Sequence, residues 1–169
     1  MIDPQTKPDG EEYLAYNRRR WGSDGWTRSM RAAGRKEGAP YANWKVWPNT
    51  THASRLLLLA ERHGLADRLI GRLYAMCYEE GENVSLRETV ARAAVAVGVP
   101  GGEAYALSGD GMHELTDALR TAKINGKRVS SAPTFNVSVG KAAHDFSGAQ
   151  DAESWVSIFE HFAELIGAR

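Results

Sequence analysis

The stretch that decides the fold is Ser130-Ser131-Ala132-Pro133-Thr134-Phe135-Asn136-Val137-Ser138-Val139. From Thr134 onward polar and apolar residues alternate, which is typical of a strand with one buried face. Gly140 and Lys141 follow as a turn, and residues 142–147 return as an antiparallel partner. Asp151 then caps a last helix with an amphipathic pattern. We expect its inward face to carry Trp155, Ile158, Phe159, Phe162 and Leu165.

Helical patterns dominate the chain before this unit. Apolar residues at helical spacing, bounded by capping residues and glycines, predict helices over residues 11–21, 24–33, 50–63, 66–80, 85–97 and 112–122. The helix over 50–63 is capped by Asn49 or Thr50, and Ser85-Leu86-Arg87-Glu88 matches a capping box. The segment 44–47, Trp-Lys-Val-Trp, is either a short extended piece or a loop that lays two indoles on the core.

The charge balance argues against partners that would bind mainly through electrostatic attraction to a charged protein. In 169 residues, 21 Lys and Arg are matched by 21 Asp and Glu, so the formal net charge is zero. A neutral chain has no global attraction to nucleic acid or to an anionic membrane, and its apolar runs are too short to span a bilayer. We therefore expect neither a nucleic-acid nor a membrane partner.

Cys77 is the only cysteine, which excludes a disulfide within the chain and suits a reducing compartment, so the cytoplasm is expected. It lies in an apolar helical segment rather than at a helix start beside basic groups, so the sequence predicts a structural and unreactive thiol. The five histidines show no metal-ligand spacing with Cys77 or with one another. We expect neither a metal nor a cofactor.

Four motifs in order carry a resemblance to a known family: Trp47-Pro48-Asn49-Thr50-Thr51-His52-Ala53, Tyr78-Glu79-Glu80-Gly81-Glu82-Asn83-Val84-Ser85, Ala132-Pro133-Thr134-Phe135 and Phe146-Ser147-Gly148-Ala149-Gln150. Together they resemble the DsbA-like thioredoxin family, and specifically its FrnE-like cytosolic branch. The resemblance implies an α/β fold, thioredoxin-like of the DsbA type, in one domain over 1–169. A helical insertion lobe covers about 11–125, and a residual thioredoxin lobe covers about 126–169.

The resemblance also implies segments that this sequence does not contain. In the family a strand, a Cys-x-x-Cys at a helix start and a second strand come first, and Met1-Ile2-Asp3-Pro4 is similar to the segment after that second strand. We therefore expect a thioredoxin sheet that is incomplete in its N-terminal half. Three explanations stay open: a shortened gene model, splice form or fragment; a chain that has lost redox chemistry; or missing strands supplied by another chain.

The same resemblance selects the candidate site residues. Ala132, Pro133 and Thr134 are expected to face a protein or peptide substrate, with Pro133 in the cis form, which outside such turns is uncommon. The alternative is a trans proline that starts an edge strand. Asn49 and Gln150 are candidate cleft residues, although capping explains Asn49 equally well.

Three functions follow from these expectations. The family activity is thiol–disulfide exchange, but without a Cys-x-x-Cys this chain is expected to be redox-inactive. The alternative is a peptide-binding or chaperone-like module that uses the strand edge beside Pro133, an edge that also favours self-association. A relative of 2-hydroxychromene-2-carboxylate isomerase is disfavoured, because Gly148-Ala149-Gln150-Asp151 lacks the arginine of the glutathione pattern.

Overall fold

The computed structural model describes residues 5–124, 127–129, 131–165 and 167. The chain divides into two compact units, one ending at Asp117 and the other beginning at Ala118. The segment 1–4, which is similar to the segment after the family's second strand, lies outside the described residues, as do residues 125–126 at the predicted ending of the helix over 112–122. No helix of the described part is long and apolar enough to cross a bilayer.

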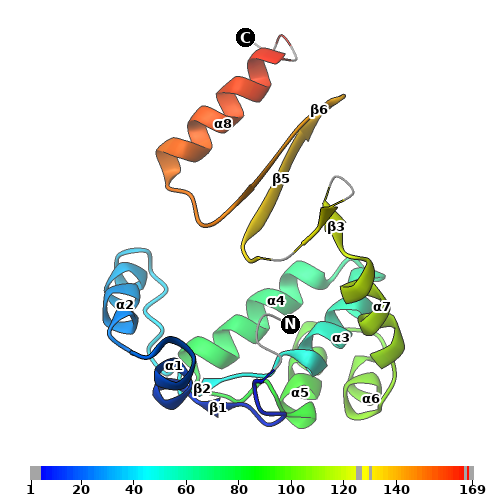
Figure 1. The fold of residues 1–169 in the computed structure, drawn as a ribbon. Coiled ribbons are helices and arrows are strands. Elements are labelled where there is room, and N and C mark those ends of the chain that lie inside the picture. Colours follow the sequence, from blue (N-terminus) through cyan, green and yellow to red (C-terminus); the bar gives the residue numbers. More distant parts are fainter. Residues whose placement is uncertain (1–4, 125–126, 130, 166, 168–169) are drawn as a thin grey trace. The chain divides into compact units, whose positions relative to one another are not determined.

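The first unit is predominantly helical (Figure 1). Its elements are β1 (Glu11–Glu12), α1 (Tyr13–Trp21), α2 (Trp26–Lys36), β2 (Val46–Trp47), α3 (Thr51–Glu61), α4 (Ala66–Tyr74), the π-helical turn η1 (Ala75–Glu79), α5 (Arg87–Val97), α6 (Gly102–Leu107) and α7 (Met112–Thr121), the last of which continues past Asp117. α3, α4, α5 and α6 pack on one another. Leu56, Leu69, Val90 and Ala94 lie at their contacts with no exposed surface, and burial of each large apolar side chain contributes about 1.5–3 kcal/mol.

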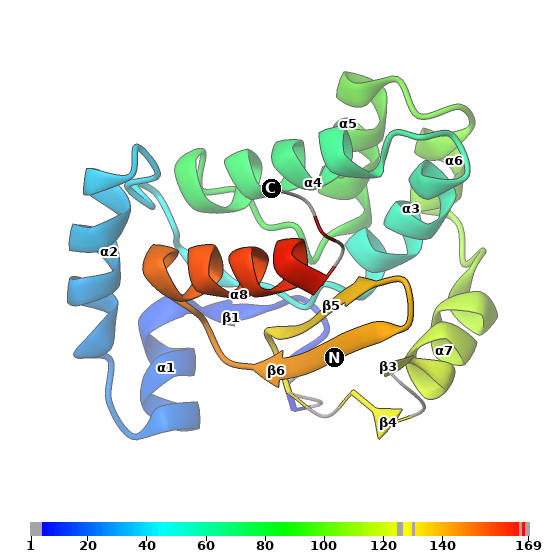
Figure 2. The ribbon, with the colours of Figure 1, turned by 90° about the horizontal axis from the view of Figure 1, so that it is seen from above.

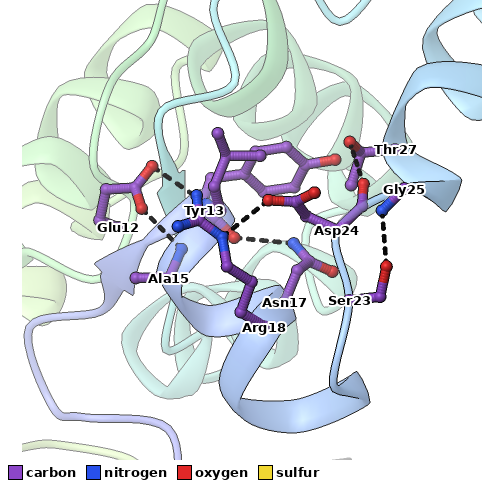
Figure 3. A network of polar contacts seen from close by, with 10 residues as sticks. Glu12, Tyr13, Ala15, Asn17, Arg18, Ser23, Asp24, Gly25 and Thr27 are labelled. Carbon is purple, nitrogen blue, oxygen red and sulfur yellow. Dashed lines mark hydrogen bonds and ion pairs between the residues drawn. The ribbon is translucent and has the colours of Figure 1, made fainter.

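The chain enters α1 through a short strand rather than a longer helix. Glu11 and Glu12 pair with Trp47 and Val46, so the segment 44–47 ends in a strand. The carboxylate of Glu12 then caps α1, accepting from the backbone amides of Leu14 and Ala15 at 3.0 and 2.6 Å (Figure 3). The predicted helix start at residue 11 is wrong by two residues because these amides needed a side-chain acceptor, which Glu12 supplies from the strand.

The helix predicted over 66–80 changes type before it ends. α4 stops at Tyr74, and the following turn is π-helical, with the Glu80 amide donating to the Ala75 carbonyl at 3.0 Å. Asn43 explains the wider turn: its backbone amide donates to the Tyr78 carbonyl at 3.0 Å, and its Nδ2 donates to the Glu79 carbonyl at 2.7 Å. A distant loop therefore satisfies carbonyl groups at the helix end.

The capping box predicted at Ser85 does not form. α5 begins at Arg87, and its N-cap residue Leu86 makes no side-chain cap bond among the described residues. The Ser85 hydroxyl instead accepts from the backbone amide of Asn49 at 2.9 Å. The Ser85 hydroxyl oxygen therefore takes part in a tertiary hydrogen bond and does not cap α5.

A buried arginine organises the segment after α6, a helix that the sequence patterns did not predict. Arg55 has no exposed surface. Its guanidinium donates to the carbonyl oxygens of Asp110 (2.7 Å), Tyr105 (2.8 Å) and Ser108 (3.1 Å). The Tyr105 carbonyl belongs to the last turn of α6, where cations are favoured by the helix dipole, and the Ser108 and Asp110 carbonyls follow that turn. Arg55 therefore holds α6 and the next loop against α3.

The second unit consists of strands and one helix. Its elements are β3 (Lys123–Ile124), β4 (Lys127–Arg128), β5 (Thr134–Val139), β6 (Ala142–Ser147) and α8 (Ala152–Leu165). β5 and β6 form the predicted hairpin around Gly140 and Lys141. α8 contacts β5 and lies along one face of the hairpin (Figure 2). Its start is capped as predicted, because the Ser154 amide donates to Asp151 Oδ1 at 2.8 Å.

The face of α8 is only partly buried. Trp155 packs edge-on against Phe135 and Phe146, with ring centroids 4.9 and 5.2 Å away, and Phe162 is buried. The expectation that Phe159 and Leu165 also face inward is wrong, since they are 56% and 55% exposed. A two-stranded hairpin offers too little apolar area to cover a fourteen-residue helix.

Replacing Arg55 with Met should destabilise the first unit strongly. The substitution keeps an apolar stem but removes three hydrogen bonds from a charged donor, each worth about 1.5–3 kcal/mol, and it leaves the Asp110 carbonyl without its donor. We expect a loss of roughly 3 kcal/mol or more in the free energy of unfolding, measured by urea denaturation. Arg62→Met is the control, because the Arg62–Glu114 ion pair lies on the surface and its loss should barely move the midpoint. Equal midpoint shifts for both variants would contradict this role.

Stability should fall as the pH drops below the usual pKa of His52. His52 Nδ1 lies 3.1 Å from Arg55 Nη1. It can accept a hydrogen bond from this guanidinium group only when the imidazole ring is neutral. Burial, and then the charges of Arg55 and Arg87, lower the pKa of His52. The unfolded chain therefore binds this proton more readily than the folded chain, and stability is lost between about pH 6.5 and the lower folded pKa. Urea midpoints between pH 7.5 and 5.5 should decline less in His52→Asn, whose Oδ1 still accepts. The same slope in both proteins would exclude His52 as the cause.

Candidate functional site

The candidate site is the turn before β5 and the strand edge that follows it. Ala132 and Pro133 are exposed, and the peptide bond between them is cis. Thr134 begins β5, and its hydroxyl donates to the Ser131 carbonyl at 2.7 Å. In the described part of the chain, the backbone amide and carbonyl of Ala132 have no hydrogen-bond partner. The site therefore presents free main-chain groups to solvent.

The register of the hairpin determines which backbone groups of β5 point outward. Val139 pairs with Ala142 across the two-residue turn, and the Gly148 amide donates to the Pro133 carbonyl at 2.9 Å. Because hydrogen-bonded and non-hydrogen-bonded pairs alternate along an antiparallel ladder, residues 133, 135, 137 and 139 bond to β6. The amides and carbonyls of Thr134, Asn136 and Ser138 point the other way.

This outward edge is unpaired within the described residues, where β5 pairs with β6 alone. Its side chains separate by face. Thr134, Asn136 and Ser138 lie on the polar face, and Asn136 Nδ2 donates to Asp145 Oδ1 across the hairpin at 2.7 Å. Phe135 and Val137 lie on the opposite face, partly buried toward α8. The edge is therefore a regular main-chain surface six residues long.

A cluster of hydroxyls supports the turn, and sequence reasoning missed it. The Oγ atoms of Ser131 and Ser147 and the Oγ1 atom of Thr134 lie within 3.1 Å of one another. No histidine or carboxylate bonds to this cluster among the described residues, so the structure offers no base to activate a hydroxyl. The cross-strand pairing of Thr134 with Ser147 could have indicated the cluster.

Gln150 is connected to this turn, whereas Asn49 belongs to the other unit. Gln150 Nε2 donates to the Gly148 carbonyl at 3.1 Å, and the Gly148 amide bonds Pro133. Asn49 Oδ1 accepts from the Thr51 amide at 3.1 Å, and its Nδ2 donates to the Thr6 carbonyl at 3.3 Å. Asn49 thus bonds the first amide of α3 from the position before the N-cap residue Thr50, and it also holds the N-terminal segment, so its amide group is occupied by the scaffold.

Cys77 lies in the π-helical turn of the first unit and is 3% exposed. Burial raises the pKa of its thiol to about 12. The thiol is therefore protonated near neutral pH, whereas the nucleophile in disulfide chemistry is the thiolate. The described residues also contain no group of three or more His, Cys, Asp or Glu side chains that could hold a metal ion.

Comparisons with known proteins agree with the hairpin and helical arrangement. The family model described as DSBA-like thioredoxin domain matches residues 23–159. The chain belongs to this family. A crystal structure of a probable DsbA oxidoreductase from Streptomyces coelicolor superposes with a TM-score of 0.71, covering 99% of this chain and 73% of that one at 19% sequence identity. The match shows that the chain has the DsbA-like thioredoxin fold. A comparison with curated protein sequences gave no match.

Family membership explains the arrangement but supplies no dithiol. The sequence of 169 residues holds one cysteine, and the structure buries it in the helical unit. The edge of β5 is a solvent-accessible and regular main-chain surface of this DsbA-like domain. What the described site can do chemically is therefore main-chain hydrogen bonding.

Proposed function

We propose that this DsbA-like chain binds extended polypeptide along the free edge of β5 and performs no thiol–disulfide exchange with Cys77. The outward amides and carbonyls of Thr134, Asn136 and Ser138 are the observation that carries the proposal. An extended peptide can add to such an edge as a further strand, gaining affinity from main-chain bonds that do not depend on its sequence. The free backbone groups of Ala132 extend the same edge toward Pro133.

The side chains on the two faces of β5 indicate which kind of peptide would bind at its edge. The polar face carries small side chains, and the other face carries Phe135 and Val137. Trp155 of α8 packs on Phe135 and also contacts the exposed Phe159. A strand with alternating residues would place its apolar side chains beside this second face. We therefore propose unfolded protein segments with apolar residues at every second position as the ligand class.

Self-association is the competing use of the same edge. Two copies could pair β5 with β5, because an exposed strand edge recruits any available strand. Self-association needs a second copy of the chain, so it predicts that the apparent molecular mass rises with protein concentration. A peptide ligand instead binds the monomer.

Within the family we propose the FrnE-like branch and a cytoplasmic location. The motifs over 47–53 and 78–85 support the branch. In the structure Asn49 and Asn83 organise turns there, since Asn83 Oδ1 accepts from the Ser85 amide at 3.0 Å. The single buried thiol supports a reducing compartment, because such a chain has no stabilising disulfide to lose.

Ser138→Pro should weaken peptide binding while Ser138→Ala should not. Proline removes one outward amide and places its ring on the edge, and an edge strand tolerates it. We expect at least about tenfold weaker binding of an alkylated, unfolded polypeptide to the proline variant. Fluorescence anisotropy measures binding, and circular dichroism checks that the hairpin persists. Equal affinities of the two variants would rule out the β5 edge. Sedimentation that shifts with concentration, and is lost only in Ser138→Pro, would favour self-association.

Insulin reduction with dithiothreitol should proceed no faster with this chain than without it. The thiol of Cys77 is buried, and its raised pKa keeps it protonated near neutrality. Cys77→Ala should therefore give the same turbidity trace as the unsubstituted chain. Catalysis that disappears in Cys77→Ala would overturn the assignment of Cys77 as structural.

A further inference from the structure

The first unit contains an aromatic cavity of about 650 Å³ beside η1. Four aromatic residues of its wall come from the loop before β2 and from the α4–η1 segment: Tyr41, Trp44, Tyr74 and Tyr78. Met30 and Pro40 add further apolar surface. This volume lies in the range of pockets that hold small molecules. None of the β5 residues of the proposed peptide site contributes to the wall.

The rings of this wall contact one another at different angles. Tyr78 stands edge-on to Tyr41 and to Trp44, with centroids 5.4 and 4.8 Å apart. Tyr74 is tilted against Tyr78 at 5.5 Å, and it is 58% exposed. Trp44 also packs against Tyr13 and Trp47, with centroids 4.2 and 5.4 Å away, so the exposed ring of Tyr74 supplies the most accessible π-face of the wall. Such faces attract cations, most strongly where water is excluded.

Glu79 is the one charged residue among the described residues of the wall. Its Oε1 accepts from the Tyr41 amide at 2.8 Å, and its Oε2 accepts from the Ala42 amide at 3.0 Å. These bonds fix the carboxylate without neutralising it, because an ionised carboxylate offers about four acceptor positions. The cavity therefore combines aromatic faces with one negative charge.

The loop that carries Tyr41 and Trp44 is held in one conformation. Tyr41 has a φ of 53°, which is uncommon for a residue with a side chain. Arg31 donates to the carbonyl oxygens of Tyr41 and Trp44, the second at 3.1 Å. Residues held in such backbone regions cluster at ligand sites, as do π-helical turns. A preformed wall lowers the entropy that a ligand must lose on binding.

We propose that this cavity binds a small organic cation, such as a quaternary ammonium group attached to a short apolar or hydroxylated chain. The exposed ring of Tyr74 lies against the cation at the aromatic wall, and Glu79 supplies the complementary charge. An anionic ligand is disfavoured because Glu79 would repel it and no wall residue of the described chain carries a positive charge.

The test compares choline with 3,3-dimethyl-1-butanol, in which carbon replaces the charged nitrogen. Binding to the full chain is followed by NMR shifts of the Trp44 indole and by calorimetry. Choline should bind, and the neutral compound should bind at least about tenfold more weakly, because both fill the same space but only one carries the charge. Equal affinity for both compounds, or no shift with choline at millimolar concentration, would overturn the proposal.

Three variants assign the effect to this cavity. Tyr74→Ala removes an exposed ring and should weaken choline binding about fivefold without affecting the fold. Glu79→Gln should remove most of the preference for choline over its neutral counterpart. Glu80→Gln is the matched control: Glu80 follows directly, is exposed and pairs with Arg72 outside the cavity wall, so choline affinity should stay unchanged. Loss of affinity in Glu80→Gln together with none in Tyr74→Ala would place the cation elsewhere.

Discussion

The hydrogen-bonding register of the β5–β6 hairpin is the constraint on which the second unit depends. The bond from the Gly148 amide to the Pro133 carbonyl extends that register beyond the strands. The same register turns Phe135 toward Trp155 and leaves the amides of Thr134 and its alternate neighbours pointing outward. A slip of one residue would exchange both the buried face and the free edge. Core formation and the availability of the binding edge therefore have a single cause.

The first unit is held together by arginine side chains that bind backbone carbonyls from loops. Arg55 holds the segment after α6, and Arg31 holds the loop of Tyr41 and Trp44. A guanidinium group presents five donors in a fixed plane, so it can satisfy carbonyls from several turns at once. Irregular segments thereby become rigid without forming strands or helices. The aromatic cavity depends on this arrangement, because two of its rings come from such a loop.

Membership of the DsbA-like family accounts for the fold of this chain, whereas its chemistry depends on its own side chains. The DsbA-like fold is carried by the helical unit and by the hairpin with α8. Thiol–disulfide exchange needs a thiolate near the surface, and Cys77 is a buried, protonated thiol in a helical turn. A fold carries only those activities for which its particular side chains are suited. In the described residues, an unpaired main-chain edge and an aromatic-lined cavity are accessible.

The sequence by itself determined the hairpin, its turn, the Asp151 cap and most helices, because alternation, helical spacing and capping act between near neighbours. It also indicated that Cys77 is buried and that a strand begins at Thr134, directly after Pro133. Only the tertiary structure decided the π-helical turn, the use of Ser85 by Asn49, the burial of Arg55 and the aromatic cavity. Each of these depends on hydrogen bonds or ring contacts between residues that are distant in the chain. Local patterns carry no information about which distant donor reaches a given acceptor once the helices pack.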